Sequence, residues 1–216
     1  MQIELAGEKL ILSPQKAMFW ISERKLIVSD LHLGKVSHFR RNGISVPTQA
    51  RFSNLIQLEL LIREFEPQSV LFLGDLFHSN YNLEWEEFGH FIQAFDQVAF
   101  ELVEGNHDIM HPKHYQKFQI KVHANGLISG PFIFTHIPLD QHGHHYNLSG
   151  HIHPGVRLTG KGRQSLKLPC FYFGEHGGIL PAFGDFTGKF MLKPNKKDRI
   201  YVVTDQQVID MSAEKK

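Results

Sequence analysis

The chain has 216 residues, enough for one sizeable hydrophobic core, and no linker rich in Pro, Gly or Ser divides it, so we expect a single domain over residues 1–216. Its apolar fraction of 42% and charged fraction of 21% are typical of a globular protein, and no apolar run is long enough to cross a bilayer. The net charge of +1 neither favours nor excludes an acidic partner, because a local basic patch does not appear in the total.

Short apolar stretches between residues 2 and 29 predict hairpins that lead into a first buried strand, Leu26–Val28, which stops at Asp30 and His32. A loop to Pro47 follows, and it carries the basic residues Lys35, His38, Arg40 and Arg41. Lys35, Arg40 and Arg41 would gather substrate phosphate, or this is a solvated basic loop; charge alone favours neither.

Two predicted helices then alternate with two more buried strands. The first helix spans about 48–65, and the strand 69–73 after it ends in Gly74 and Asp75. The second helix begins at a cap residue, Asn82, and the strand 98–103 after it ends in Gly105-Asn106-His107-Asp108. This alternation predicts a parallel sheet with right-handed crossovers, whose strands release polar residues at one edge.

From Ile120 onward, short strands separated by Gly and Pro turns predict a second, mainly antiparallel sheet packed on the first. Two of these strands end in histidines, His136 in one case and His151 with His153 in the other. The expected strands are 121–123, 127–129, 132–135, 147–149, 156–159, 166–168, 171–173 and 199–203.

The amino terminus and the cysteine content predict a cytoplasmic protein. Residues 1–5 have neither a basic start nor an apolar export signal, and the single Cys170 cannot form an internal disulfide. The 15 histidines exceed ordinary usage, and imidazole is the commonest side-chain ligand for transition metals.

Five blocks now stand in order: Asp30-x-His32, Gly74-Asp75, Gly105-Asn106-His107-Asp108, His136 and Gly150-His151-x-His153. This ordered set resembles the signature of the calcineurin-like metallophosphoesterases. The resemblance implies a four-layer α/β/β/α sandwich, in the α/β class, with two metal ions at the edge of the paired sheets. A metal-dependent phosphoric ester hydrolase is therefore expected.

The resemblance also implies which residues bind the two ions. Asp30, His32 and His153 would hold one ion, Asn106, His136 and His151 the other, and Asp75 would bridge them. Carboxylate, imidazole and amide ligands without thiolate suit Mn, with Fe or Zn as alternatives. Two such ions activate water and neutralise phosphoryl oxygens during in-line attack.

Outside the ligand set, His107 is predicted to donate a proton to the leaving oxygen, and Asp108 to orient the His107 ring. Gly74, Gly105 and Gly150 are predicted to allow the backbone to pass close to the ions.

A narrower resemblance involves residues 34–47, 74–79 and 180–188, which look like the corresponding parts of the bacterial ligase-associated DNA damage response endonucleases. Members of that group are encoded with a DNA ligase and a DEXH-box helicase, which implies a functional association with both in DNA repair. Ile137 follows the metal-site histidine where relatives are expected to carry a carboxylate, and the cluster His142 to His145 looks specific to this chain.

The leading hypothesis is a dimetal phosphodiesterase or endonuclease acting on nucleic acid or a nucleotide, with no membrane partner. The alternatives are a nucleotide or nucleotide-sugar pyrophosphohydrolase, and a non-catalytic metal-binding scaffold. Lipid A pathway pyrophosphohydrolases share the fold but have Arg where His107 stands, and a scaffold would not need the complete ligand set. The substrate, the metal used in the cell and the oligomeric state stay open at this point.

Overall fold

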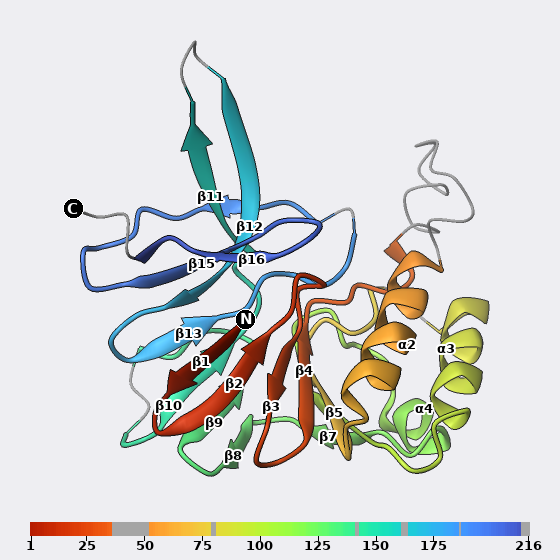
Figure 1. Cartoon of the computed structure of the whole chain (residues 1–216). Helices are drawn as coiled ribbons and strands as arrows, with labels where there is room; N and C mark the ends of the chain where they lie inside the picture. The colour runs from red at the N-terminus through yellow and green to blue at the C-terminus, as the bar shows by residue number, and fades with distance from the viewer. Residues whose placement is uncertain (36–51, 79–80, 141–142, 161–163, 186, 213–216) are drawn as a thin grey trace.

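Two β-sheets face each other, and the helices in the described part of the chain cover the outer face of the first sheet (Figure 1). The structure is a computed structural model, and it describes residues 1–35, 52–78, 81–140, 143–160, 164–185 and 187–212. No helix in the described part of the chain is long and apolar enough to cross a membrane.

The first sheet begins as an antiparallel meander and continues as a parallel sheet. Strands β1 to β4 pair in antiparallel order, whereas β4 to β7 are parallel to one another. The predicted hairpins and the parallel arrangement are thus confirmed. The seven strands lie in chain order: β1 Gln2–Leu5, β2 Glu8–Leu12, β3 Met18–Trp20, β4 Lys25–Ser29, β5 Ser69–Leu73, β6 Ala99–Val103 and β7 Lys121–His123.

Among the described residues the helices are α2 Ser53–Phe65, α3 Leu83–Gln93 and α4 Pro112–Lys117. Asn82 caps α3 as predicted, because its side-chain oxygen accepts hydrogen bonds from the backbone N–H groups of Glu84 and Trp85. The first helix was expected from residue 48, and residues 48–51 lie outside the described part of the chain.

One expectation is wrong at the end of the first sheet. Residues 121–123 were assigned to the second sheet, but β7 pairs in parallel with β6. The short helix α4, which was not predicted, supplies the crossover between these strands. Its local signal is His111 as the cap, whose ring nitrogen accepts the N–H of Lys113, followed by Pro112 in the first turn.

The second sheet is mixed. Most of its strand pairs are antiparallel, but β10 lies parallel to both β9 and β13, and β14 lies parallel to β11. Two expected strands, 166–168 and 171–173, are one strand, β12, which changes partners from β11 to β13 and β15 after Pro169. The strands are β8 Leu127–Ser129, β9 Phe132–Thr135, β10 Tyr146–Ser149, β11 Pro154–Thr159, β12 Ser165–Phe173, β13 Gly177–Ile179, β14 Phe190–Met191, β15 Arg199–Val203 and β16 Val208–Asp210.

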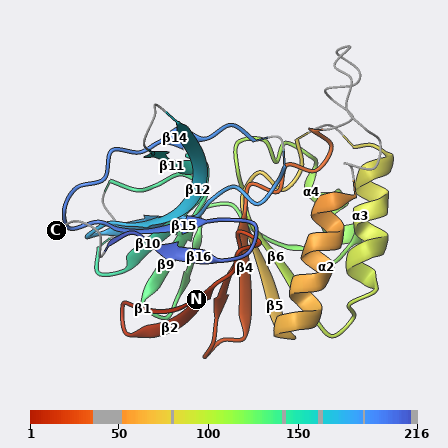
Figure 2. The same cartoon turned by 45° about the horizontal axis from the view of Figure 1, so that its top comes forward.

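The first sheet separates two large apolar cores, which explains why its central strands are continuous apolar runs. Val70 and Phe72 of β5 face the helices, whereas Leu71 and Leu73 face the second sheet. Trp20 packs edge-on against Phe132 across the space between the sheets, with ring centroids 5.0 Å apart. Figure 2 shows the helices and the second sheet on opposite sides of β4 and β5.

The mixed α/β fold with two facing sheets is confirmed, with a difference in the fourth layer. The outer face of the second sheet buries a small cluster of Cys170, Ile200 and Val202. Among the described residues no helix covers this cluster, and Val156, Leu192 and Met211 pack against it instead. Because the cluster is small, short chain segments are sufficient to cover it.

Candidate metal centre

The predicted ligands follow strand ends that meet at one edge of the two sheets. Asp30, Asp75 and Asn106 come after β4, β5 and β6, whose last residues Ser29, Leu73 and Val103 are in register. In the second sheet, the ends of β9 and β10 are in register as well, so His136 and Gly150-His151 emerge together. The parallel pairing within each sheet therefore brings residues distant in sequence to one place.

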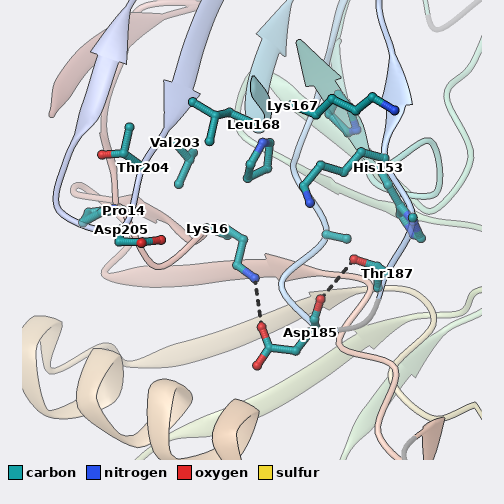
Figure 3. A pocket seen from close by; sticks show the side chains of 16 residues that line it. Pro14, Lys16, His153, Lys167, Leu168, Asp185, Thr187, Val203, Thr204 and Asp205 are labelled. Carbon is teal, nitrogen blue, oxygen red and sulfur yellow. Dashed lines mark hydrogen bonds and ion pairs between the residues drawn. The ribbon is translucent and has the colours of Figure 1, made fainter. Parts of the chain in front are cut away.

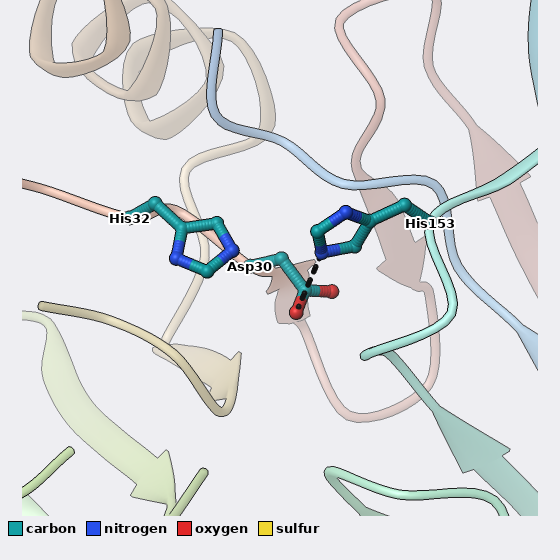
Figure 4. A group of neighbouring side chains, drawn as sticks. All are labelled: Asp30, His32 and His153. Atoms are coloured by element: carbon teal, nitrogen blue, oxygen red, sulfur yellow. Dashed lines mark ion pairs between the residues drawn. The ribbon is translucent and has the colours of Figure 1, made fainter. Parts of the chain in front are cut away.

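The first ligand group contains Asp30, His32 and His153 (Figure 4). One ligand atom from each lies within 4.8 Å of those of the other two, and His153 Nε2 is 3.3 Å from Asp30 Oδ1. Asp30 is fully buried, and its carboxylate accepts the backbone N–H of His151. The backbone of His151 thus holds the Asp30 carboxylate in place.

His32 is a buried imidazole without a hydrogen-bond partner for either ring nitrogen among the described residues. Burial, assisted by the charge of Lys35, lowers the pKa of His32 to about 3. The ring is therefore neutral, which is the form that binds a metal. An unpaired buried nitrogen is costly unless a ligand satisfies it, and this observation fits a metal ion at the first group.

The second ligand group contains Asp75, His136 and His151, with Asn106 beside them. His136 Nδ1 lies 3.1 Å from the carbonyl oxygen of Leu73, which leaves Nε2 available as a ligand atom. His136 Nε2 lies 3.0 Å from Asn106 Oδ1, 3.1 Å from His151 Nδ1 and 3.4 Å from Asp75 Oδ1. Separations of roughly 3 Å are those of neighbouring ligand atoms around an ion with bonds of about 2.0–2.2 Å.

Asp75 lies between the two groups. Its Oδ1 lies 3.4 Å from His136 Nε2, whereas its Oδ2 is 3.9 Å from His32 Nε2 in the other group. Burial would raise the pKa of Asp75, but the hydrogen bond and charge of His136 and the backbone N–H of His107 outweigh burial and lower it to about 2. A permanently charged carboxylate facing both groups is the arrangement that a bridging ligand requires.

Backbone strain accumulates at these residues. Five of the seven predicted ligands are non-glycine residues with φ between 49° and 65°, in the left-handed region: Asp30, His32, Asp75, His151 and His153. Such conformations cost of order 1 kcal/mol each and persist where the surrounding structure enforces them, often at functional sites.

Three glycines make room for the ligand side chains. A Cβ atom on Gly74 would lie 2.2 Å from His136 Nδ1, one on Gly105 2.5 Å from Asp75 Oδ1, and one on Gly150 2.5 Å from Asp30 Oδ2. Each predicted glycine therefore permits a close approach that alanine would block.

His107 lies at the open side of the site. Its backbone N–H donates to Asp75 Oδ1 at 2.9 Å, and its side chain is 43% exposed, with Nε2 4.0 Å from Asp75 Oδ2. The residue is thus anchored through its backbone while its ring remains accessible to a substrate.

Asp108 has a different contact from the one expected. Its buried carboxylate accepts the backbone N–H groups of Phe77 and Gly105, and no hydrogen bond or ion pair joins it to the His107 ring in the described structure. Burial raises the pKa of Asp108 to about 7, although the hydrogen bonds from these two backbone N–H groups act to lower it. Asp108 therefore holds the turn that carries His107 instead of holding the ring.

His78 also lies at the site, although nothing in the sequence pattern assigns it there; it follows Asp75 by three residues. Its ring centroid lies 4.1 Å from that of His107 and 5.3 Å from that of His32.

A segment after β13 was also not recognised as support for the centre. The backbone N–H of Gly184 donates to the carbonyl of Asp30, and a Cβ at Gly184 would lie 2.4 Å from the carbonyl oxygen of Leu31.

Of the three residues predicted to bind substrate phosphate, Lys35 is close to the centre. Burial lowers the pKa of Lys35, while the nearby carboxylates of Asp75 and Asp30 oppose that effect. Arg40 and Arg41 lie outside the described residues.

Comparisons with known proteins show which family and which solved structures the chain is similar to. The calcineurin-like phosphoesterase family matches residues 24–203. The crystal structure of the Pseudomonas putida nuclease MPE is similar over 98% of this chain and 99% of that one, with 29% identity and a TM-score of 0.83. A phosphoesterase from E. coli, Yfce, matches over 86% of this chain and 96% of that one, with 13% identity and a TM-score of 0.42. None of the curated proteins matches the sequence.

Proposed function

We propose that this chain, which belongs to the calcineurin-like phosphoesterase family, is a two-metal phosphodiesterase that cleaves nucleic acid in DNA repair. Its family membership and its similarity to a nuclease make it a metal-dependent phosphoester hydrolase. The observation that carries the finer proposal is the convergence of two ligand groups on the two oxygens of Asp75. The similarity to the Pseudomonas putida nuclease over nearly the whole chain supports a polynucleotide as the substrate.

In this proposal, Asp30, His32 and His153 hold one ion, and Asn106, His136 and His151 hold the second, with Asp75 between them. The imidazole, carboxylate and amide donors suit manganese, and the unpaired ring nitrogens of His32 fit a metal at the first group. When bound, two such ions supply Lewis acidity for the phosphoryl oxygens and lower the pKa of the attacking water.

The chain itself contributes a proton donor. The exposed His107 ring reaches the solvent side of the centre, where the leaving oxygen of a bound phosphodiester would lie. A ribose or deoxyribose alkoxide is a poor leaving group, so a positioned imidazolium accelerates its departure. Asp108 supports this step indirectly, because its bonds to Phe77 and Gly105 hold the turn on which His107 lies.

The cellular setting is proposed from the sequence. The single Cys170 is free and buried, which agrees with a reducing cytoplasm. The resemblance of residues 34–47, 74–79 and 180–188 to ligase-associated endonucleases supports an association with a DNA ligase and a DEXH-box helicase.

A substrate screen tests the proposal. The protein is loaded in turn with Mn²⁺, Zn²⁺, Fe²⁺ or Mg²⁺ and assayed on single-stranded DNA, duplex DNA, RNA, cyclic nucleotides and nucleotide sugars, with a chelated sample as the control. We expect the highest kcat/KM with Mn²⁺ on a polynucleotide and no turnover in the chelated sample. A preference for nucleotide sugars would instead identify a pyrophosphohydrolase, and binding of metal without any turnover would identify a scaffold.

A further inference from the structure

A cavity of about 290 Å³ opens beside the first ligand group, between the second sheet and the segment that carries Asp185 and Thr187 (Figure 3). His153 forms part of its wall, and the Nε2 atom of the same residue lies 3.3 Å from Asp30 Oδ1. The cavity therefore adjoins the candidate metal centre. Its volume is near the lower end for ligand sites, about 300 to 1,000 Å³, and suits a single nucleotide unit.

Three lysines and two aspartates line the cavity: Lys16, Lys167, Lys189, Asp185 and Asp205. Lys16 is already paired, with its Nζ 3.6 Å from Asp185 Oδ1, and Ser53 donates to the other oxygen of Asp185. Lys167 and Lys189 are exposed, and neither forms an ion pair with a carboxylate in the described part of the chain. Lys16 and Asp185 neutralise each other, which leaves Lys167 and Lys189 against Asp205. The wall of the cavity therefore carries a net positive charge.

Strand register determines where Lys167 points. In the β11–β12 hairpin, Lys167 is paired with Arg157 and Pro169 with Gly155, so these four residues share one face. The opposite face carries Val156 and Leu168, which pack on the apolar cluster of the second sheet. The face with Lys167 and Arg157 is thus polar and basic, and the hairpin projects from the body of the protein (Figure 1).

Lys189 is brought to the same face by β14. The backbone N–H of Phe190 donates to the carbonyl of His153 at 3.0 Å, and β14 then pairs in parallel with the start of β11. A Cβ atom on Gly155 would lie 3.2 Å from Lys189 Cβ. Lys189 therefore starts directly beside the hairpin face that carries Lys167, next to the candidate ligand His153.

We propose that this cavity and the basic face of the β11–β12 hairpin bind the phosphodiester backbone of the nucleic acid next to the scissile phosphate, with Lys167 and Lys189 as the phosphate-contacting residues. The inference rests on the proposed function and adds the path of the substrate away from the metal centre. The phosphates of a nucleic-acid strand are negative, and Lys167 and Lys189 form no ion pair within the described part of the chain. Contact between these ammonium groups and the phosphates would release condensed counterions.

The test compares two double variants of the full-length protein loaded with Mn²⁺. Lys167→Ala/Lys189→Ala removes both proposed contacts. The matched control, Lys196→Ala/Lys197→Ala, removes the same charge from two exposed lysines that line a different hollow, beside Gly174 and Gly177. Each variant is assayed on bis(p-nitrophenyl) phosphate, which has one phosphate, and on a single-stranded DNA oligonucleotide, and oligonucleotide binding is titrated with salt.

We expect Lys167→Ala/Lys189→Ala to bind the oligonucleotide about 10- to 30-fold more weakly than the wild type at about 0.1 M salt. The slope of the logarithm of the binding constant against the logarithm of the salt concentration should also become less negative by about 1.4, because each single-strand phosphate contact contributes about 0.7. The kcat/KM of this variant should fall much more on the oligonucleotide than on the small ester. The control variant should keep the wild-type ratio of kcat/KM on the oligonucleotide to kcat/KM on the small ester.

Two results overturn the inference in different ways. Equal salt slopes in both double variants, with a wild-type protein that cleaves DNA, would refute the binding path and leave the proposed function standing. A wild-type protein that hydrolyses the small ester but no polynucleotide would refute the proposed function and this inference with it.

Discussion

Asp75 connects the two ligand groups, because each of its carboxylate oxygens faces a different one. Asp75→Asn keeps the shape of the side chain but removes the charge. We expect this variant to retain less than the wild-type content of metal and to lose activity by about 10²–10³-fold or more, since a charged group in a buried site has been removed. Metal analysis of the purified protein measures the first effect independently of activity.

The matched control for this variant is Asp96→Asn, at an exposed aspartate beyond the end of α3. It should keep wild-type metal content and turnover. Two ions per chain together with full activity in Asp75→Asn would remove Asp75 from the centre.

The proposed role of His107 as a proton donor can be tested by comparing substrates with different leaving groups. A general acid contributes about 10²–10⁴-fold when the leaving oxygen needs a proton, and much less when it leaves readily as an anion. His107→Asn should therefore lose about that factor on a dinucleotide but considerably less on bis(p-nitrophenyl) phosphate. Parallel assays of His90→Asn, at an exposed histidine in the last turn of α3, give the control.

Metal content should stay unchanged in His107→Asn, because this residue lies outside both ligand groups. Equal losses on the two substrates would mean that His107 stabilises charge on the phosphoryl group. A loss of bound metal would show that it is a ligand.

At the scale of elements, the turn after β10 is a point of close approach between the two sheets. A Cβ atom on Gly150 would lie 2.5 Å from Asp30 Oδ2, 2.9 Å from Ser29 Cβ and 3.1 Å from the carbonyl oxygen of Leu73. Gly150→Ala must therefore push the second sheet away from β4 and β5 or displace Asp30. We expect a loss of about 1–3 kcal/mol in the free energy of unfolding from overpacking.

The same substitution should weaken metal binding about 10- to 100-fold, as expected when the support of a ligand is disturbed. Urea unfolding and metal titration measure the two effects. Gly160→Ala is the control, because a Cβ atom there meets nothing within 4 Å. Identical unfolding curves and metal affinities in both variants would contradict the proposed junction of the sheets.

Elements differ in how well their sequences reveal them. β4 and β5 each contain an apolar run, Leu26–Val28 and Val70–Leu73, and a carboxylate follows each strand. Such runs are typical of strands buried on two faces, so the sequence predicts both strands. The sequence does not predict the pairing partner of β7, because three residues are too few to specify a sheet. The preceding helix α4, which has only six residues, is equally hard to recognise. In such short elements, hydrogen bonding to a neighbour decides the structure, and periodicity carries little information.

For the whole molecule, the two apolar cores on either side of the first sheet should unfold together, because β4 and β5 contribute side chains to both. The two tryptophans report on them separately: Trp20 is buried in the core between the sheets and Trp85 in the core under the helices. We expect fluorescence of Trp20→Phe and Trp85→Phe variants to follow the same urea transition as far-UV circular dichroism of each variant.

A helical signal that melts before the inter-sheet signal would contradict this expectation and divide the chain into two cooperative units. Coincident transitions would support the single domain proposed from the uninterrupted composition of residues 1–216.

The candidate ligands are predicted from the sequence alone, because each follows an apolar strand end and the residue types in that order resemble one family signature. The sequence also determined the glycines that had to lie beside them. Three features become visible in the folded chain: Asp75 faces both ligand groups, Asp108 holds a turn and not the His107 ring, and Lys16, Lys167 and Lys189 line one cavity. The physical reason is that strand register and the packing of one sheet on another are long-range contacts, whereas sequence patterns report only which face of a local element is buried.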